Sequence, residues 1–149
     1  MFIGLLWPSA MRYSDNILSR IRKQYSVTSE LYSFATAGSF KKFVVGIYKP
    51  DNTPMRRIMS KFKVMRKCNL VVNVMYIEID NPEMIPHRKS RLRGTFYCRN
   101  MKSLKKAIRN KYKGKIKRYV HDVIIHISDN EEHNRRTKRL LDKFAQRVQ

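Results

Sequence analysis

The sequence predicts an α+β domain in which helices cover an antiparallel sheet, and three observations support this prediction. First, four apolar stretches rich in β-branched or aromatic residues have strand character, at 42–48, 70–79, 92–98 and 119–127. Second, three segments have apolar residues at helical spacing, at 55–67, 101–112 and about 131–145. Third, the resulting order matches the β-α-β-β-α-β unit of the ferredoxin-like fold, with one further helix at the C-terminus.

The chain divides into an N-terminal arm at 1–39 and the ferredoxin-like domain at 40–149. The apolar start, Met1 to Pro8, is too short to span a bilayer and lacks the basic flank of a signal peptide. It is therefore expected to be a tail that packs onto the domain or onto a partner. The rest of the arm is expected to be partly helical, with one helix beginning near Ser14 and a second, short helix within 27–34.

The composition is strongly basic. Lys and Arg number 33 against 11 Asp and Glu, which gives a formal net charge of +22. Such a charge attracts polyanions, so nucleic acid is the leading partner class, followed by an anionic membrane surface and by a nucleoprotein particle. A homo-oligomer is left open. Cys68 and Cys98 match no metal or redox spacing, which favours a reducing intracellular compartment, cytoplasmic or nuclear, over secretion.

The segment around His126 is the first candidate site. The predicted strand 119–127 stops at Ser128-Asp129-Asn130-Glu131, a capping-box pattern that starts the last helix. The free backbone N–H groups of a helix N-terminus bind anions, so His126 lies where phosphate chemistry is feasible. The alternative is a strand-end histidine that packs in the core or faces solvent. The other histidines, His87, His121 and His133, have no metal-binding spacing, and no metal site is predicted.

Two motifs stand at the ends of predicted strands. The first strand ends in Lys49-Pro50-Asp51, and the last ends in His126-Ile127-Ser128-Asp129 before a helix. In these residues the sequence resembles the nucleoside diphosphate kinases, whose split β-α-β core has a first strand ending in Lys-Pro-Asp and a last strand ending in His-Gly-Ser-Asp. The resemblance covers about residues 42–80 and 95–144.

The resemblance implies that His126 is a catalytic nucleophile that forms a phosphohistidine, while Lys49 neutralises the phosphoryl oxygens. Mg²⁺ would enter with the nucleotide rather than occupy a protein site of its own. The nucleotide- or phosphate-binding residues that it implies are Lys49, Asp51, Ser128, Lys113 and Lys115. The family's nucleotide-clamping helical hairpin has no counterpart here, so an active phosphotransferase and an inactive relative both remain open.

A one-sided basic tract supports a second hypothesis, a non-enzymatic nucleic-acid-binding protein or nucleoprotein subunit. Residues 84–121 contain no Asp or Glu, and tyrosines are interleaved among their cations. The segment Arg93 to Cys98 half-matches the third strand of RNA-recognition motifs, a weaker resemblance. The cations of helix 101–112 are expected to face outward. The predicted nucleic-acid contacts are Lys102, Lys105, Lys106, Arg109, Lys111, Lys117 and Arg118.

Overall fold

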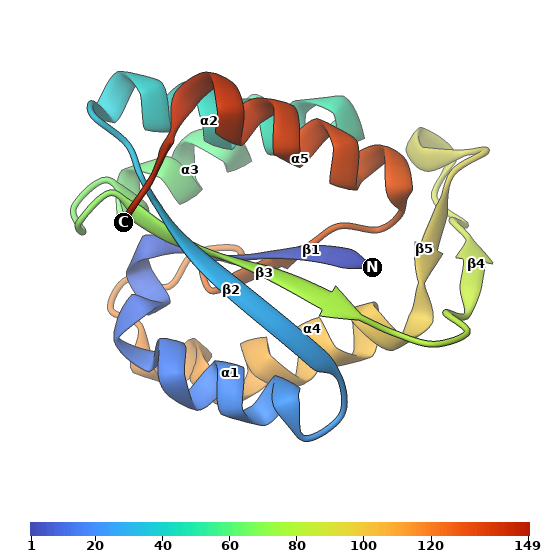
Figure 1. The fold of residues 1–149 in the computed structure, drawn as a ribbon. Helices are drawn as coiled ribbons and strands as arrows, with labels where there is room; N and C mark the ends of the chain where they lie inside the picture. The colour runs from blue at the N-terminus through green and yellow to red at the C-terminus, as the bar shows by residue number, and fades with distance from the viewer.

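A five-stranded antiparallel sheet lies between two layers of helices in the computed structural model, which describes residues 1–149 (Figure 1). In sheet order the strands are β6 (Ile125–Ile127), β1 (Phe2–Leu6), β3 (Val71–Glu78), β2 (Ser26–Ser33) and β7 (Gln146–Arg147). One face of the sheet is covered by α1 (Ser14–Arg22) and α4 (Arg99–Tyr112). The other face is covered by α2 (Ala37–Tyr48), α3 (Met55–Met65) and α5 (Glu131–Phe144). The predicted α+β class and antiparallel sheet are confirmed.

A separate hairpin and four short 3-10 turns complete the chain. The hairpin pairs β4 (Met84–Pro86) with β5 (Phe96–Cys98) and lies to one side of the main sheet (Figure 1). The 3-10 turns are η1 (Pro8–Tyr13), η2 (Lys49–Asp51), η3 (Ser90–Leu92) and η4 (Lys113–Lys115). No helix has the length and apolar character that crossing a membrane requires.

The N-terminal segment is a central strand, which corrects the prediction of an arm at 1–39. β1 pairs with β3 on one side and with β6 on the other, and all five of its residues are buried. Alternate side chains enter two different cores, with Phe2 and Leu6 facing α1 and α4, and Ile3 and Leu5 facing α2 and α3. A strand covered on both faces is apolar throughout, so its sequence lacks the alternation typical of a half-exposed strand.

Two further elements were predicted with the wrong type. Residues 27–34, expected to be helical, form most of β2, which pairs with β3 along its full length. Residues 42–48, expected to be the first strand, are the second half of α2. The apolar residues of α2 are buried at helical spacing, and Thr36 and Ser39 form a capping box at its start. Burial between the sheet and α5 therefore outweighs the β propensity of its valines and isoleucine.

The remaining predicted elements are correct in type but two are shorter. α3, β3, α4 and α5 fall within two residues of their predicted bounds. The predicted strand 92–98 is reduced to β5 in the separate hairpin, and the strand 119–127 is reduced to β6. Arg118 and His121 adopt left-handed backbone conformations, with φ of 55° and 50°, and so break the extended run before β6.

Candidate anion-binding site

A cavity of about 770 Å³ lies between α3, α4, the β4–β5 hairpin and the segment that leads to β6. We call it the first cavity. Its 21 lining residues include ten cations contributed by segments far apart in the sequence. These cations are Arg57, Lys61, Arg88, Lys89, Arg91, Lys102, Lys105, Lys106, Arg109 and Lys113. Only three carboxylates line the same cavity, those of Asp51, Asp122 and Asp129.

Asp122 is held by two cations of the cavity wall. Its Oδ2 atom lies 2.7 Å from Nη2 of Arg109, and its backbone oxygen accepts a hydrogen bond of 2.9 Å from Nζ of Lys61. Arg109 also donates to the backbone oxygen of Ile125 at 2.8 Å, which ties α4 to β6. The negative charge of Asp122 is therefore already matched by a protein cation and does not offset the rest of the wall.

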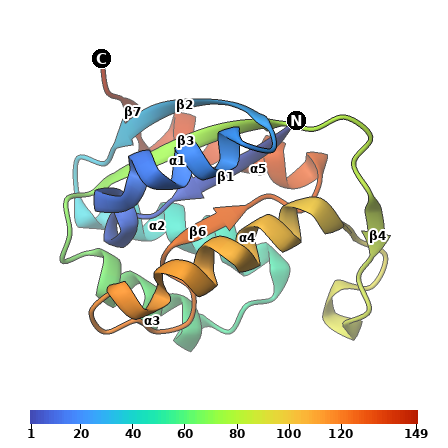
Figure 2. The same ribbon diagram turned by 90° about the horizontal axis from the view of Figure 1, so that it is seen from below.

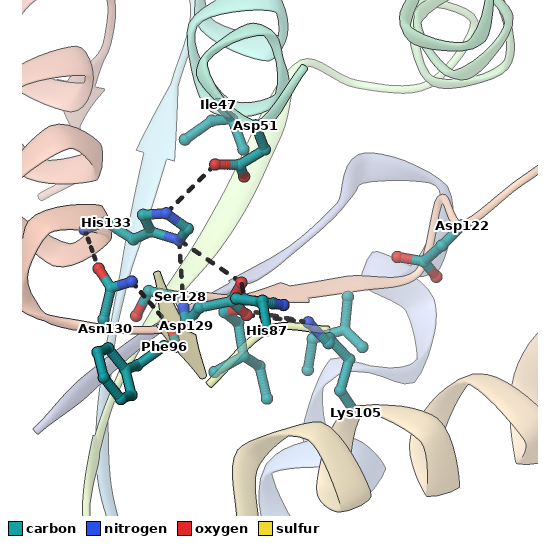
Figure 3. Close-up of polar contacts among 12 residues, drawn as sticks. Ile47, Asp51, His87, Phe96, Lys105, Asp122, Ser128, Asp129, Asn130 and His133 are labelled. Atoms are coloured by element: carbon teal, nitrogen blue, oxygen red, sulfur yellow. Dashed lines mark hydrogen bonds and ion pairs between the residues drawn. The ribbon is translucent and has the colours of Figure 1, made fainter. Parts of the chain in front are cut away.

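Asp51 and Asp129 belong to a chain of alternating carboxylates and imidazoles (Figure 3). Nε2 of His133 lies 3.2 Å from Asp51, and Nδ1 of the same ring accepts from the backbone N–H of Asp129 at 3.4 Å. The Asp129 carboxylate lies 3.1 Å from Nε2 of His87 and 3.9 Å from Nζ of Lys105. These contacts place His133 as a donor to Asp51 and fix the orientation of His87 at the cavity wall.

His126 lines the first cavity from the middle of β6, with 7% of its surface exposed. Its ring meets the Tyr48 ring edge-to-face, with centroids 5.4 Å apart. Burial lowers the pKa of His126 well below its ordinary value, and the positive charges of Lys105, Arg109 and Lys61 lower it further. The imidazole is therefore neutral at physiological pH, which is the nucleophilic form.

This pKa depression predicts that the protein loses stability in mild acid. Below about pH 6.5 the unfolded chain protonates His126 while the folded chain does not, so the free energy of unfolding falls by up to about 1.4 kcal/mol per pH unit. The loss continues as the pH falls toward the pKa of the folded state. Urea unfolding at about pH 7.5 and pH 5.5 measures the effect. His126→Gln is expected to show a smaller loss, and an equal loss in both proteins would contradict the assignment.

Tyr48 and Lys61 form the floor of the cavity together with His126. The hydroxyl of Tyr48 is buried in the protein interior, beside the Trp7 side chain. Nζ of Lys61 lies 4.1 Å from the centroid of the Tyr48 ring, and burial lowers the pKa of this amine to about 8. The amine keeps its charge near neutral pH because Asp122 opposes the effect of burial.

The structure brings together part of the predicted site. Of the residues predicted to bind phosphate, Asp51 and Lys113 line the first cavity with His126, whereas Lys49 is exposed in η2 and does not line it. Four of the five cations of α4 predicted as nucleic-acid contacts, all but Lys111, line the first cavity. Lys102, Lys106 and Lys111 are exposed as expected, whereas the side chain of Lys105 is only 15% exposed and that of Arg109 is 28% exposed. Lys115, Lys117 and Arg118 line a different cavity.

Ser128, also predicted to bind phosphate, does not line the first cavity and connects two elements of the fold instead. Its hydroxyl accepts a hydrogen bond of 3.0 Å from the backbone of Ile3 and donates to Asn134, so it joins β1 to α5. The residue that caps α5 is Asn130, whose side chain accepts from the backbone N–H of His133 at 3.0 Å. The capping box predicted at Ser128 is therefore two residues too early.

Several residues of the cavity wall were not among the predicted site residues. Lys61 had a detectable signal, because it lies among Ile58, Phe62 and Met65 on the buried face of α3. A lysine on an apolar helical stripe points to a buried cation with a partner or a function. His87 and the hairpin cations had no comparable signal, since only the tertiary structure places them beside α4. The residues of the chain form no cluster of three or more His, Cys, Asp or Glu that would hold a metal ion.

The fold and the cavity define a basic α+β protein with a cation-lined cavity around a neutral histidine. Comparison with known proteins adds no family to this description: no family model matches the sequence, and no curated protein is significantly similar to it.

Proposed function

We propose that this protein binds a nucleotide, or a phosphate-bearing molecule of similar size, in the first cavity. The observation that carries the proposal is the excess of cations, because ten line the cavity and each of its three carboxylates already has a cationic or imidazole partner. The volume of about 770 Å³ is in the range of small-molecule sites. Arginine and lysine side chains bind phosphate oxygens through charge-assisted hydrogen bonds.

The proposal extends to phosphoryl transfer, with His126 as the acceptor. A ring nitrogen of the neutral imidazole would attack the terminal phosphorus of a nucleoside triphosphate, forming a P–N bond as the bond to the leaving nucleoside diphosphate breaks. Arg109, Lys105 and Lys61, whose charges act on His126, would stabilise the charge that develops on the phosphoryl oxygens. Mg²⁺ would accompany the nucleotide. Lys49 is given no role in this step.

We also infer that the sheet is built on a ferredoxin-like core, with different strands from those expected. The strand order β6-β1-β3-β2 and the antiparallel pairs on either side of β1 and β3 support this assignment. So does the position of α1 and α4 on one face. On this view α2 and α3 are an insertion between the second and third core strands, and the insertion supplies one wall of the first cavity.

Incubation with γ-labelled ATP and Mg²⁺ tests the chemical step. The wild-type protein is expected to acquire an acid-labile, base-stable phosphate, and His126→Ala is expected to acquire none because it lacks the acceptor nitrogen. His121→Ala is the matched control, since this histidine is exposed and outside the cavity. Label on the control should equal that on the wild type. No label on the wild type would remove the phosphohistidine and leave a binding protein, whereas label that persists in His126→Ala would remove His126 as the acceptor.

A further inference from the structure

A second basic cavity, of about 700 Å³, lies between η1, the C-terminal half of α3 and the connection 115–118. Six of its ten lining residues are cations, and none is Asp or Glu. None of the six forms an ion pair with a carboxylate elsewhere in the chain, so none of their charge is offset, whereas three carboxylates line the first cavity. The six cations are Arg12, Lys63, Lys67, Lys115, Lys117 and Arg118.

The two cavities follow one another along the same helix. Arg57 and Lys61 of α3 line the first cavity, whereas Lys63 and Lys67 line the second. The rise of an α-helix places Arg57 and Lys63 about 9 Å apart along the axis of α3, and Lys67 follows just after the end of the helix. The connection 113–122, which runs beside α3 in Figure 2, also contributes residues to both cavities. A ligand that reaches both must therefore be elongated and carry negative charge along its length.

We propose that the second cavity binds the backbone phosphates of a single-stranded nucleic acid whose terminal nucleotide occupies the first cavity. The inference rests on the proposed function, because it assigns the nucleotide of the first cavity to the end of a polymer. The cations of the two cavities would contact successive phosphates of a nucleic-acid backbone. Such contacts release counterions from the nucleic acid, which favours binding. Tyr97 and Tyr119 line the first cavity and offer aromatic surface to bases, which a purely inorganic polyanion would not use.

Binding measurements on one pair of lysines test this inference. The affinities for ATP and for a single-stranded oligonucleotide of about eight nucleotides are measured over a range of salt concentrations. Wild type is expected to bind the oligonucleotide at least about tenfold more tightly than ATP. In Lys63→Gln/Lys67→Gln the ratio of the two affinities should fall toward one. The slope of log affinity against log salt concentration for the oligonucleotide should become shallower by about two, one for each lost phosphate contact.

The matched control is Arg22→Gln/Lys23→Gln. It removes two exposed cations at the end of α1, on the opposite face of the sheet from α3, and should keep the wild-type ratio. An equal loss in the control would reduce the effect to net charge and overturn the inference. So would equal affinity for ATP and the oligonucleotide, or equally tight binding of a duplex or of inorganic polyphosphate. Failure of wild type to bind ATP at all would instead contradict the proposed function.

Discussion

Arg109→Leu is expected to weaken ATP binding by about 100-fold and to lower the free energy of unfolding by about 3 kcal/mol. The guanidinium is 28% exposed and lies 2.7 Å from the Asp122 carboxylate, which is 9% exposed. Its removal leaves Asp122 buried without its charge partner. It removes the hydrogen bonds that Arg109 donates to the carbonyl oxygen of Ile125. It also removes a cation from beside His126. Calorimetric titration and urea unfolding measure the two effects separately.

A double variant separates binding from stability in this prediction. Arg109→Leu/Asp122→Leu no longer buries an unpaired carboxylate, so part of the lost stability should return. ATP binding should stay weak, because the cation proposed to contact phosphate is still absent. Full recovery of binding in the double variant, or wild-type affinity in the single variant, would contradict the place given to Arg109 in the first cavity.

Trp7→Ala is expected to cost about 3–5 kcal/mol of folding free energy, the largest loss of stability predicted for this chain. Trp7 follows β1 directly and is fully buried, with its ring edge-to-face against Phe40 and Phe43 at centroid distances of 6.4 and 6.1 Å. The variant leaves a large cavity where the N-terminal segment meets α2. Denaturant unfolding measures the loss.

Phe96→Ala is the control for this prediction. Phe96 is 48% exposed in the separate hairpin, so its truncation should change stability by no more than about 0.5 kcal/mol. Equal and small losses in both variants would indicate that the N-terminal segment is a peripheral arm, as its sequence had suggested.

Helices with a wide apolar stripe and clear ends, and the long strand β3, could be predicted from the sequence, whereas the short apolar runs of β1 and α2 could not. The stripes of α3, α4 and α5 mark one buried face each, and their predicted bounds were nearly correct. β1 and α2 are both short runs of almost continuous apolar residues, and such runs have no periodicity that separates strand from helix. Tertiary packing decides whether such a run becomes a strand or a helix. At Gly46 in α2, for example, a Cβ would lie 2.6 Å from Cδ2 of Leu140 in α5.

The candidate site was predictable only where one residue carried its own signal. His126 was identified from the transition between a core strand and a helix N-terminus, and the structure places it in the first cavity. Lys49 was chosen because a strand was expected before it, and that strand is the helix α2. Four of the cations singled out on α4 line the first cavity, but this depends on the β4–β5 hairpin, which lies against the same cavity. Such convergence of distant segments has no local signature in the chain.

The most direct measurement of the central claim is an equilibrium titration of the wild-type protein with ATP at low and at moderate salt. The cation-lined cavity predicts one saturable site per chain, with an affinity that falls steeply as salt rises, because several phosphate contacts are screened together. Absence of saturable binding at low salt, or binding whose strength ignores salt and survives Arg109→Leu, would contradict the claim that this cavity binds phosphate.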